Sequence, residues 1–329
     1  MLLSSPVRKH RFDPLKQAIE KGIIMLTPVE KRALTAFKAG GDVIYSKADS
    51  STPNGWLCFG IYLLLKAGAM IRNVRLEPME SQVSFKPDKT PVTKTDVEIE
   101  AFFRKAFNRF SPDTEVIGEE NGGTLSPKGL SVAVDPIDGT WAFVNRLETC
   151  ATSLLLMSDS LPFMGMVLNP VSGELAYGGD NIKTRLLQMS VFGEKERGYD
   201  LPLDRVSTGR LLVNVHPQAR GGRLLARLYA GWEKQEIRMV RSVGGSPAYA
   251  LLDAAKGTFS YTNLWAMKPA EPYDIAAGIL LVRGAGGEVI DLYGKPVNLF
   301  DHEGPFVAGT DLEAVKTLQE ICCDIMKAG

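Results

Sequence analysis

The sequence predicts an α/β fold, a layered α+β sandwich, for most of the chain. Segments with apolar residues at helical spacing alternate with short runs typical of β-strands, and the two kinds interleave throughout. At 329 residues, the chain is long enough for about two domains of roughly 150 residues each. Its apolar content of 45% and charged content of 23% are those of an ordinary soluble globular protein.

The N-terminal segment is charged and mixed in composition. Residues 1–53 are expected to form an extension of unknown role, with one helix from Pro28 to Ala39 that ends at Gly40 and Gly41. A linker rich in Ser, Thr, Pro, Asn and Gly follows at 50–55. The main body of the fold is therefore expected to begin near residue 54.

A strongly apolar helix is expected from Trp56 to about Leu76. Its apolar stretch ends near Ile71, which makes it shorter than the roughly 20 residues that a membrane span needs, and Lys66 lies well inside it. A buried core helix explains this segment better than a membrane span.

A further amphipathic helix is expected after Thr95. The sequence from Thr95 to Glu98 fits a capping box, and apolar residues then recur at helical spacing as far as Phe110. Asp96 falls in the first turn and points toward whatever lies at the helix N-terminus. Compensation of the helix dipole would explain this acid equally well on spacing alone.

The remaining elements follow the same alternation. Strands are expected at 132–134, 152–157, 164–168, 211–215, 259–262 and 288–291. Helices are expected at 224–233, 246–256 and 275–283. Glycines at 284–287 end a helix and precede a strand, the reverse of the order in a dinucleotide-binding loop, so they indicate a helix cap and turn.

The segment from Asp135 to Thr140 is the most informative part of the chain. Asp135 follows a short buried strand and is expected to mark its end, because Pro136 stops ladder pairing and stiffens the turn. Asp138 can then turn back toward the same point in space. Carboxylate oxygens are the ligands that Mg²⁺ prefers, so this turn predicts a cation site.

An anion site is expected beside the carboxylates. Gly139 and Thr140 open a predicted helix whose free N–H groups favour negative charge, and Gly139 allows close approach of a phosphate to the backbone. Carboxylates for a metal next to amides for a phosphate indicate phosphoryl chemistry. A solvated Asp turn with a helix cap is the simpler alternative for these residues.

The composition argues against several other functional classes. There are 38 basic and 38 acidic residues, so the net charge of zero gives no support to binding of nucleic acid or membrane surfaces. The histidines, His10, His216 and His302, are widely scattered, which argues against a zinc site or a histidine-activated nucleophile. Cys322 and Cys323 are expected to lie on a terminal helix, and no P-loop or Gly-x-Ser-x-Gly pattern occurs.

Four blocks in order make the chain resemble the inositol monophosphatase superfamily of Mg²⁺-dependent, typically lithium-sensitive phosphatases. The blocks are residues 86–96, 117–120, 135–140 and 272–278. The resemblance implies the αβαβα architecture of inositol monophosphatases and fructose-1,6-bisphosphatases. A subdomain at 54–190 would carry the metal site, and one at 191–329 would close it.

The resemblance also implies a ligand set for two or three Mg²⁺ ions. Glu119, Asp135 and the carbonyl of Ile137 would bind the first ion, and Asp135, Asp138 and Asp274 the second. The third site found in some members would be completed at Glu119, with Asp96 nearby through water.

Further roles follow from the same motif positions. Asp96 and Thr140 would orient and deprotonate the attacking water, with Glu119 also part of the catalytic set. The phosphate and substrate would be bound by Gly139, Thr140, Asp138, Ser246 and Asn263. Glu120 and Lys86 would support the metal ligands without touching the metal. A metal-activated water and charge neutralisation suffice for such phosphoryl transfer, without a covalent intermediate.

Departures from the family pattern bear on the substrate. Tyr273 stands where tryptophan is usual before the aspartate, and Asn263 stands where inositol-specific members carry a glutamate. The segment between Asn263 and Asp274 is also longer, with Trp265, Met267 and Lys268 in the insert. Inositol monophosphate or a related sugar or polyol phosphate is the first expectation for the substrate. Histidinol phosphate, fructose-1,6-bisphosphate and 3′-phosphoadenosine 5′-phosphate are the alternatives.

A function of another class also fits the pattern: a catalytically silent member that acts as a binding or regulatory protein. The long N-terminal extension would suit it, whereas the complete set of carboxylates favours the enzyme. Lys268 or Arg241 could meet a second phosphate, although such a residue is more often a solvated surface charge. The protein is expected to be cytoplasmic, since no apolar core follows the basic residues at 8–11 as a secretory signal requires. The resemblance implies a homodimer.

Overall fold

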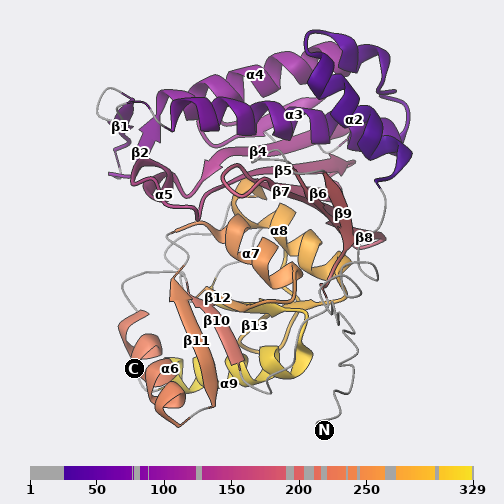
Figure 1. The fold of residues 1–329 in the computed structure, drawn as a ribbon. Coiled ribbons are helices and arrows are strands. Elements are labelled where there is room, and N and C mark those ends of the chain that lie inside the picture. Colours follow the sequence, from indigo (N-terminus) through magenta and orange to yellow (C-terminus); the bar gives the residue numbers. More distant parts are fainter. Residues whose placement is uncertain are drawn as a thin grey trace, which may run out of the picture.

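The computed structural model describes residues 26–75, 77, 82–87, 89–123, 128–189, 196–203, 211–215, 221–234, 236–242, 245–263, 272–300 and 304–327. These residues form five stacked layers in the order helix, sheet, helix, sheet, helix (Figure 1). The expected layered α/β class and its αβαβα arrangement are therefore confirmed. The expected subdomain boundary at residue 190 lies outside the described residues and stays a prediction.

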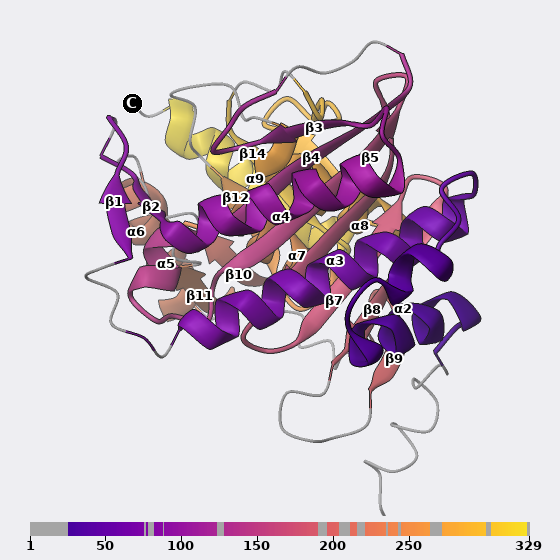
Figure 2. The same cartoon turned by 90° about the horizontal axis from the view of Figure 1, so that it is seen from above.

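The first helical layer covers one face of the larger sheet. Its helices are α2 (Pro28–Ala39), α3 (Pro53–Val74) and α4 (Lys94–Phe110), with a short 3-10 helix at Val43–Ser46 between the first two. Seen from above, α3 and α4 lie side by side across the strands, and α2 lies beside α3 (Figure 2). The bounds of α2 are those that the sequence predicts.

The start of α4 differs from the prediction. The capping box joins Thr93 to Asp96 rather than Thr95 to Glu98, because the Thr93 side chain accepts from the Asp96 N–H and the Asp96 carboxylate accepts from the Thr93 N–H. Asp96 is thus the third residue of the helix. Its predicted place in the first turn is confirmed, and its carboxylate is part of the cap itself.

The larger sheet has seven strands in the order β3-β4-β5-β6-β7-β8-β9. β3 runs parallel to β4, and the later neighbours are antiparallel. The strands are β3 (Glu115–Gly118), β4 (Leu130–Asp138), β5 (Ala151–Ser158), β6 (Leu161–Asn169), β7 (Glu174–Gly179), β8 (Ile182–Gln188) and β9 (Arg197–Asp200). A separate hairpin joins β1 (Val83–Phe85) to β2 (Pro91–Thr93).

Strand β4 continues beyond the point where the sequence predicts its end. Asp135 pairs with Ser153, and after an irregularity Asp138 pairs with Ala151. The ladder is interrupted at Pro136 as expected, but the expectation that the strand ends at Asp135 is wrong. The strand bulges at this point, and the Pro136 carbonyl accepts a hydrogen bond from the Thr152 hydroxyl at 2.8 Å, which keeps the bulge attached to β5.

Two helices fill the space between the sheets: α7 (Pro247–Ala255) and α8 (Pro272–Gly284) (Figure 1). The second sheet has the order β11-β10-β12-β14-β13. Its strands are β10 (Leu211–Val215), β11 (Ile237–Ser242), β12 (Ser260–Asn263), β13 (Glu288–Asp291) and β14 (Phe306–Gly309). The outer layer is formed by α6 (Gly221–Glu233) and α9 (Leu312–Lys327).

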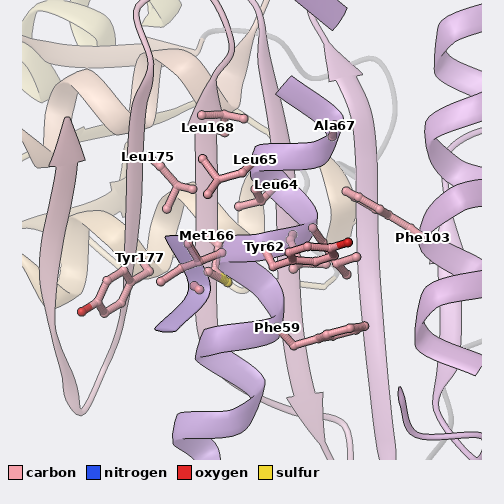
Figure 3. Packing of buried hydrophobic residues seen from close by; sticks show 14 of the residues in the cluster. Phe59, Tyr62, Leu64, Leu65, Ala67, Phe103, Met166, Leu168, Leu175 and Tyr177 are labelled. Atoms are coloured by element: carbon pink, nitrogen blue, oxygen red, sulfur yellow. The ribbon is translucent and has the colours of Figure 1, made fainter. Parts of the chain in front are cut away.

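The apolar face of α3 packs into the core between the first helical layer and the larger sheet. Phe59, Tyr62 and Leu64 of α3 lie close to Phe103 of α4 and Met166 of β6 (Figure 3). By length and composition α3 could cross a membrane, yet 67% of its most apolar window is buried inside the protein. This is the packing of a core helix in a soluble protein, as the sequence predicts.

A buried ion pair attaches α2 to the sheet. Glu30 is fully buried, and its Oε1 accepts hydrogen bonds from the Tyr177 hydroxyl and from Nε of Arg185, both at 2.8 Å. The helix N-terminus is closed by a capping box between Thr27 and Glu30. Part of the expected N-terminal extension is therefore packed against the main body of the fold.

Candidate active site

Five carboxylates from four parts of the chain lie within electrostatic reach of one another. They are Asp96 at the start of α4, Glu119 after β3, Asp135 and Asp138 at the end of β4, and Asp274 in the first turn of α8. Burial raises the pKa of Asp135 well above its ordinary value, and the other four acids raise it further. The structure thus brings together all five carboxylates that the sequence singles out.

Asp135 is the central member of this cluster. Its side chain is buried, and its Oδ1 atom has no hydrogen-bond partner. An unpaired carboxylate oxygen surrounded by like charges is costly to bury, so its presence requires a positive partner or a bound proton.

Asp138 is held by the N-terminal end of α7. Its Oδ2 accepts hydrogen bonds from the Ser246 hydroxyl at 2.7 Å and from the Ala248 N–H at 2.6 Å. Burial raises the pKa of Asp138 well above its ordinary value, although these two bonds favour the ionised form. Ser246, which the resemblance places near the substrate, is therefore in direct contact with a predicted metal ligand.

Asp96 has one satisfied and one unsatisfied oxygen. Oδ2 accepts from the Thr93 N–H at 2.8 Å and is 2.5 Å from the Thr93 hydroxyl, whereas Oδ1 is buried without a partner. Burial raises the pKa of Asp96 to about 7; the bonds from Thr93 oppose this rise, and the charges of Glu120 and Glu119 add to it. The group is poised between its two protonation states near neutral pH.

Lys86 connects the two glutamates that follow β3. Its Nζ lies 2.7 Å from Oε1 of Glu119 and 2.9 Å from Oε1 of Glu120. Burial lowers the pKa of Lys86, but the two acids outweigh it, and the net shift is upward. The positively charged ammonium group of Lys86 therefore neutralises part of the negative charge of this acidic cluster.

The turn between β4 and α5 (Thr140–Val144) is shaped by Gly139. Its φ of 84° is left-handed, and an added Cβ would lie 2.8 Å from Cβ of Ser246 and 3.1 Å from the carbonyl oxygen of Thr149. Only glycine fits here. The Thr140 hydroxyl donates to the Ile137 carbonyl at 3.1 Å. The carbonyl expected to bind the metal and the hydroxyl expected to orient the attacking water are therefore neighbours.

Asn263 lies at the end of β12, beside the hydroxyl of fully buried Tyr261. Burial raises the pKa of that tyrosine, and the charge of Asp138 raises it further, which places β12 near the acidic cluster. Trp265, Met267 and Lys268 of the predicted insert lie outside the described residues.

Arg241 forms an ion pair with Asp253 and stacks over the ring of Phe259, so its charge has a protein partner.

The residues present fit a divalent cation. Among the described residues, no three His, Cys, Asp or Glu side chains already converge closely enough to hold a metal ion. The carboxylate oxygens are nevertheless the hard donors that Mg²⁺ uses, and Oδ1 of both Asp135 and Asp96 lacks any other partner. A cation bound at Asp135, together with its water molecules, would supply the partners that these atoms lack.

Sequence reasoning missed three residues that shape this site: Thr93, Glu100 and Arg104. Thr93 binds Asp96, and Glu100 accepts hydrogen bonds from the turn that carries Glu119 and Glu120. The available signal was the spacing of Asp96 and Glu100, four residues apart and hence on one face of a helix.

The sequence pattern of the inositol monophosphatase family matches residues 55–325. The chain belongs to this family. Its members, including the relatives below, are phosphatases, and the chain is accordingly a hydrolase that acts on phosphomonoesters. Helix α2 and the residues before it lie outside the matched range.

Two curated relatives and one solved structure illustrate the similarity. The histidinol-phosphatase of Mycobacterium tuberculosis is 28% identical over 235 residues, covering 68% of this chain and 83% of the relative. The fructose-1,6-bisphosphatase/inositol-1-monophosphatase of Thermotoga maritima is 28% identical over 277 residues, covering 82% and 98%. The structure of a Thermotoga maritima IMPase superposes with a TM-score of 0.63 at 25% identity, covering 82% of this chain and 98% of that one.

Proposed function

We propose that this phosphatase is Mg²⁺-dependent and hydrolyses a small polyol or sugar phosphate, with inositol monophosphate as the first candidate. The observation that carries the metal dependence is the unpartnered, buried Oδ1 of Asp135 amid four other acids. Glu119, Asp135, Asp138, Asp274 and the Ile137 carbonyl would hold two or three ions. When bound, Mg²⁺ supplies charge for the phosphate oxygens and lowers the pKa of an attacking water.

Asp96 is the proposed proton acceptor for that water, with Thr140 orienting it. The Asp96 carboxyl already titrates near pH 7 and has one oxygen without a partner, so it can take a proton at neutral pH. Thr140 donates its own hydroxyl hydrogen to the Ile137 carbonyl, which leaves the hydroxyl oxygen free to accept from a water molecule.

The phosphate would rest against the backbone of the β4–α5 turn. Gly139 lets the backbone of this turn pack directly against Ser246 and Thr149, where any side chain would collide. The N–H groups of Gly139 and Thr140 are the proposed donors around the substrate. Ser246, at the N-terminus of α7, would line the substrate site while its hydroxyl donates to Asp138.

A second candidate substrate is histidinol phosphate. Phe85 of β1 and Trp141 of α5 are 63% and 52% exposed, with ring centroids 6.2 Å apart. Each adjoins a predicted site residue, Lys86 and Thr140 respectively. An exposed aromatic pair at this position suits a leaving group with a planar ring, and the Mycobacterium tuberculosis relative carries the name of this activity.

The deciding experiment is phosphate release from a panel of phosphomonoesters, with Mg²⁺ and with a chelator. The panel contains inositol 1-phosphate, histidinol phosphate, fructose-1,6-bisphosphate and 3′-phosphoadenosine 5′-phosphate. Metal-dependent release from inositol phosphate would support the first proposal. Preference for histidinol phosphate, lost in Trp141→Ala but retained in Trp232→Ala on α6, would support the second; Trp232 is 52% exposed and serves as a matched control.

No release from any substrate by folded protein would favour the catalytically silent binding protein. Inhibition by Li⁺ at roughly millimolar levels, with Na⁺ as the control, tests whether a small cation competes for the ligands that Mg²⁺ needs. The proposed homodimer is tested by light scattering of the full chain. The cytoplasmic location stays a prediction that cell fractionation would check.

A further inference from the structure

Glu100 is a fully buried carboxylate one helical turn beyond Asp96 on α4. Buried acids in proteins are normally paired, and this one is bound from several directions. Arg104 lies one turn further along the same helix. It donates to Oε1 of Glu100 through Nε at 2.9 Å and through Nη2 at 2.8 Å.

The other donors to Glu100 come from the turn after β3. The Glu120 N–H donates to Oε2 at 2.8 Å, and the Asn121 N–H donates to Oε1 at 3.1 Å. The Asn121 side-chain amide also donates to Oε1, at 3.0 Å, and is the third donor from this turn. Three hydrogen bonds thus join α4 to the two residues that directly follow Glu119.

Arg104 holds the two ends of the same turn. Its guanidinium donates to the Val116 carbonyl at 2.7 Å and to the Gly122 carbonyl at 2.6 Å. The turn is closed on itself by a hydrogen bond from the Gly118 N–H to the Gly122 carbonyl at 3.0 Å. Segment 116–122 is therefore fixed at its ends by Arg104 and in its middle by Glu100.

No space separates Glu100 from this turn. A Cβ added at Gly118 would lie 2.1 Å from the Glu100 carboxyl carbon, so the carboxylate is packed directly on the backbone before Glu119. Glu119 is then bounded by Gly118 on one side and by the anchored Glu120 on the other. Its side chain in turn meets Lys86.

We propose that Glu100 is a positioning residue, which acts through the 116–122 turn to set the backbone of Glu119 for cation binding. Because α4 also carries Asp96, the helix fixes two acids of the cluster relative to each other: Asp96 by covalent connection and Glu119 through Glu100. Loss of the Glu100 hydrogen bonds would loosen Glu119 without removing any group that touches metal or substrate. The inference rests on the proposed function only for its kinetic consequence.

The alternative is a purely structural ion pair, and the chain contains a matched control for it. Glu30 is also fully buried and is bound by Arg185 and Tyr177. It lies on α2, at the opposite end of the first layer from α5 and the β1–β2 hairpin (Figures 1 and 2). Glu100→Gln and Glu30→Gln each remove one buried charge and one acceptor, so both should lower the melting temperature by several degrees.

Two readouts separate positioning from general stability. The first is Mg²⁺ binding to the full-length protein by calorimetry, without substrate. Glu100→Gln should weaken binding about 10–100-fold, as is typical when a partner that orients a metal ligand is lost, while Glu30→Gln should match the wild type. The second is amide hydrogen exchange in chelator, where a peptide spanning 115–123 should exchange about tenfold faster in Glu100→Gln only.

Phosphate release adds the third measurement. Glu100→Gln should raise the Mg²⁺ concentration for half-maximal activity by the same factor as the binding constant, with little change in kcat at saturating Mg²⁺. Wild-type Mg²⁺ binding and wild-type exchange in folded Glu100→Gln would overturn the positioning role, as would equal effects in Glu30→Gln. If the wild type releases no phosphate, the proposed function fails, whereas binding and exchange still decide this inference.

A milder variant covers the case in which Glu100→Gln does not fold. Arg104 is partly exposed, and Arg104→Lys keeps a positive charge beside buried Glu100 and the Glu100 bonds to the backbone, while it removes the guanidinium that clamps the Val116 and Gly122 carbonyls. It should shift Mg²⁺ binding in the same direction by a smaller factor. Unchanged binding and exchange in this variant would contradict the proposed coupling between α4 and the turn.

Discussion

At the residue scale, Asp96 gives the metal-free protein a specific dependence on pH. Burial raises its pKa from 3.8 to about 7, so the folded protein retains a proton that the unfolded chain has released. The wild type should therefore lose stability as pH rises from about 4 to about 7, and Asp96→Asn should lose less. Urea unfolding in chelator near pH 5 and near pH 8 measures this. Identical pH dependence in the two proteins would contradict the assignment.

Asp135 should separate stability from activity. Replacement of this unpaired carboxylate by Asn removes like-charge repulsion, so metal-free Asp135→Asn should unfold at a higher temperature than the wild type near pH 8. Turnover should fall at least about 100-fold, because the charge is needed for the cation. Asp253→Asn is the matched control: Asp253 is buried but paired with Arg241 and Lys256, so its loss should destabilise. A fully active Asp135→Asn protein would refute the site.

At the scale of elements, the β4–α5 turn depends on Gly139. Gly139→Ala should lower the free energy of unfolding by about 1–3 kcal/mol, because alanine is strained at this left-handed φ. The added Cβ would also press against Cβ of Ser246 and displace its hydroxyl from Asp138. Gly286→Ala is the control, because it has a φ of 79° but open space around it. Melting temperatures should fall in both variants, and phosphate release should fall only in Gly139→Ala. Equal activities would show that the turn does not shape the site.

The sequence predicts elements well where the local pattern is strong. The bounds of α2, β10 and β13 coincide with prediction, because caps and turn residues mark their ends. Strands β7 and β8 are absent from the predicted elements, since their polar and glycine residues gain strand structure from neighbours rather than from their own pattern. The continuation of β4 past Pro136 likewise depends on a hydroxyl of the adjacent strand.

The same limit applies to the candidate site. Asp96, Asp135 and Asp138 could be singled out because acids after buried strands and at helix starts carry a local signal. Glu119 and Asp274 are singled out through the resemblance of their motifs to the family. Glu100 shares a helix face with Asp96, but in the sequence it also forms an ordinary helical pair with Arg104 four residues later, and that pair hides its role. Only the fold shows that this acid is buried beneath Gly118 and bound to the next turn.

At the scale of the whole molecule, the site gathers residues from three adjacent layers. Asp96 comes from the first helical layer, Glu119, Asp135 and Asp138 from the larger sheet and the turn after β3, and Asp274 from the helices between the sheets. Metal binding at the proposed site should therefore stabilise contacts between layers, and Mg²⁺ should raise the melting temperature of the wild type by mass action.

The packed part of the N-terminal segment should contribute to stability and not to chemistry. Deletion of residues 1–50 removes α2, uncovers an apolar face of α3 and leaves Arg185 without Glu30. The melting temperature should fall by several degrees. Turnover by folded protein at low temperature should stay within about threefold, because the five carboxylates lie on other elements.

Deletion of residues 1–25 keeps α2 and is the control, with wild-type melting expected. A folded but inactive 51–329 protein would show that the N-terminal segment completes the site. An unchanged melting temperature after removal of α2 would instead show that the buried Glu30–Arg185 pair only offsets its own desolvation, as buried ion pairs often do. Thermal unfolding and phosphate release, measured on the same three proteins, distinguish these outcomes.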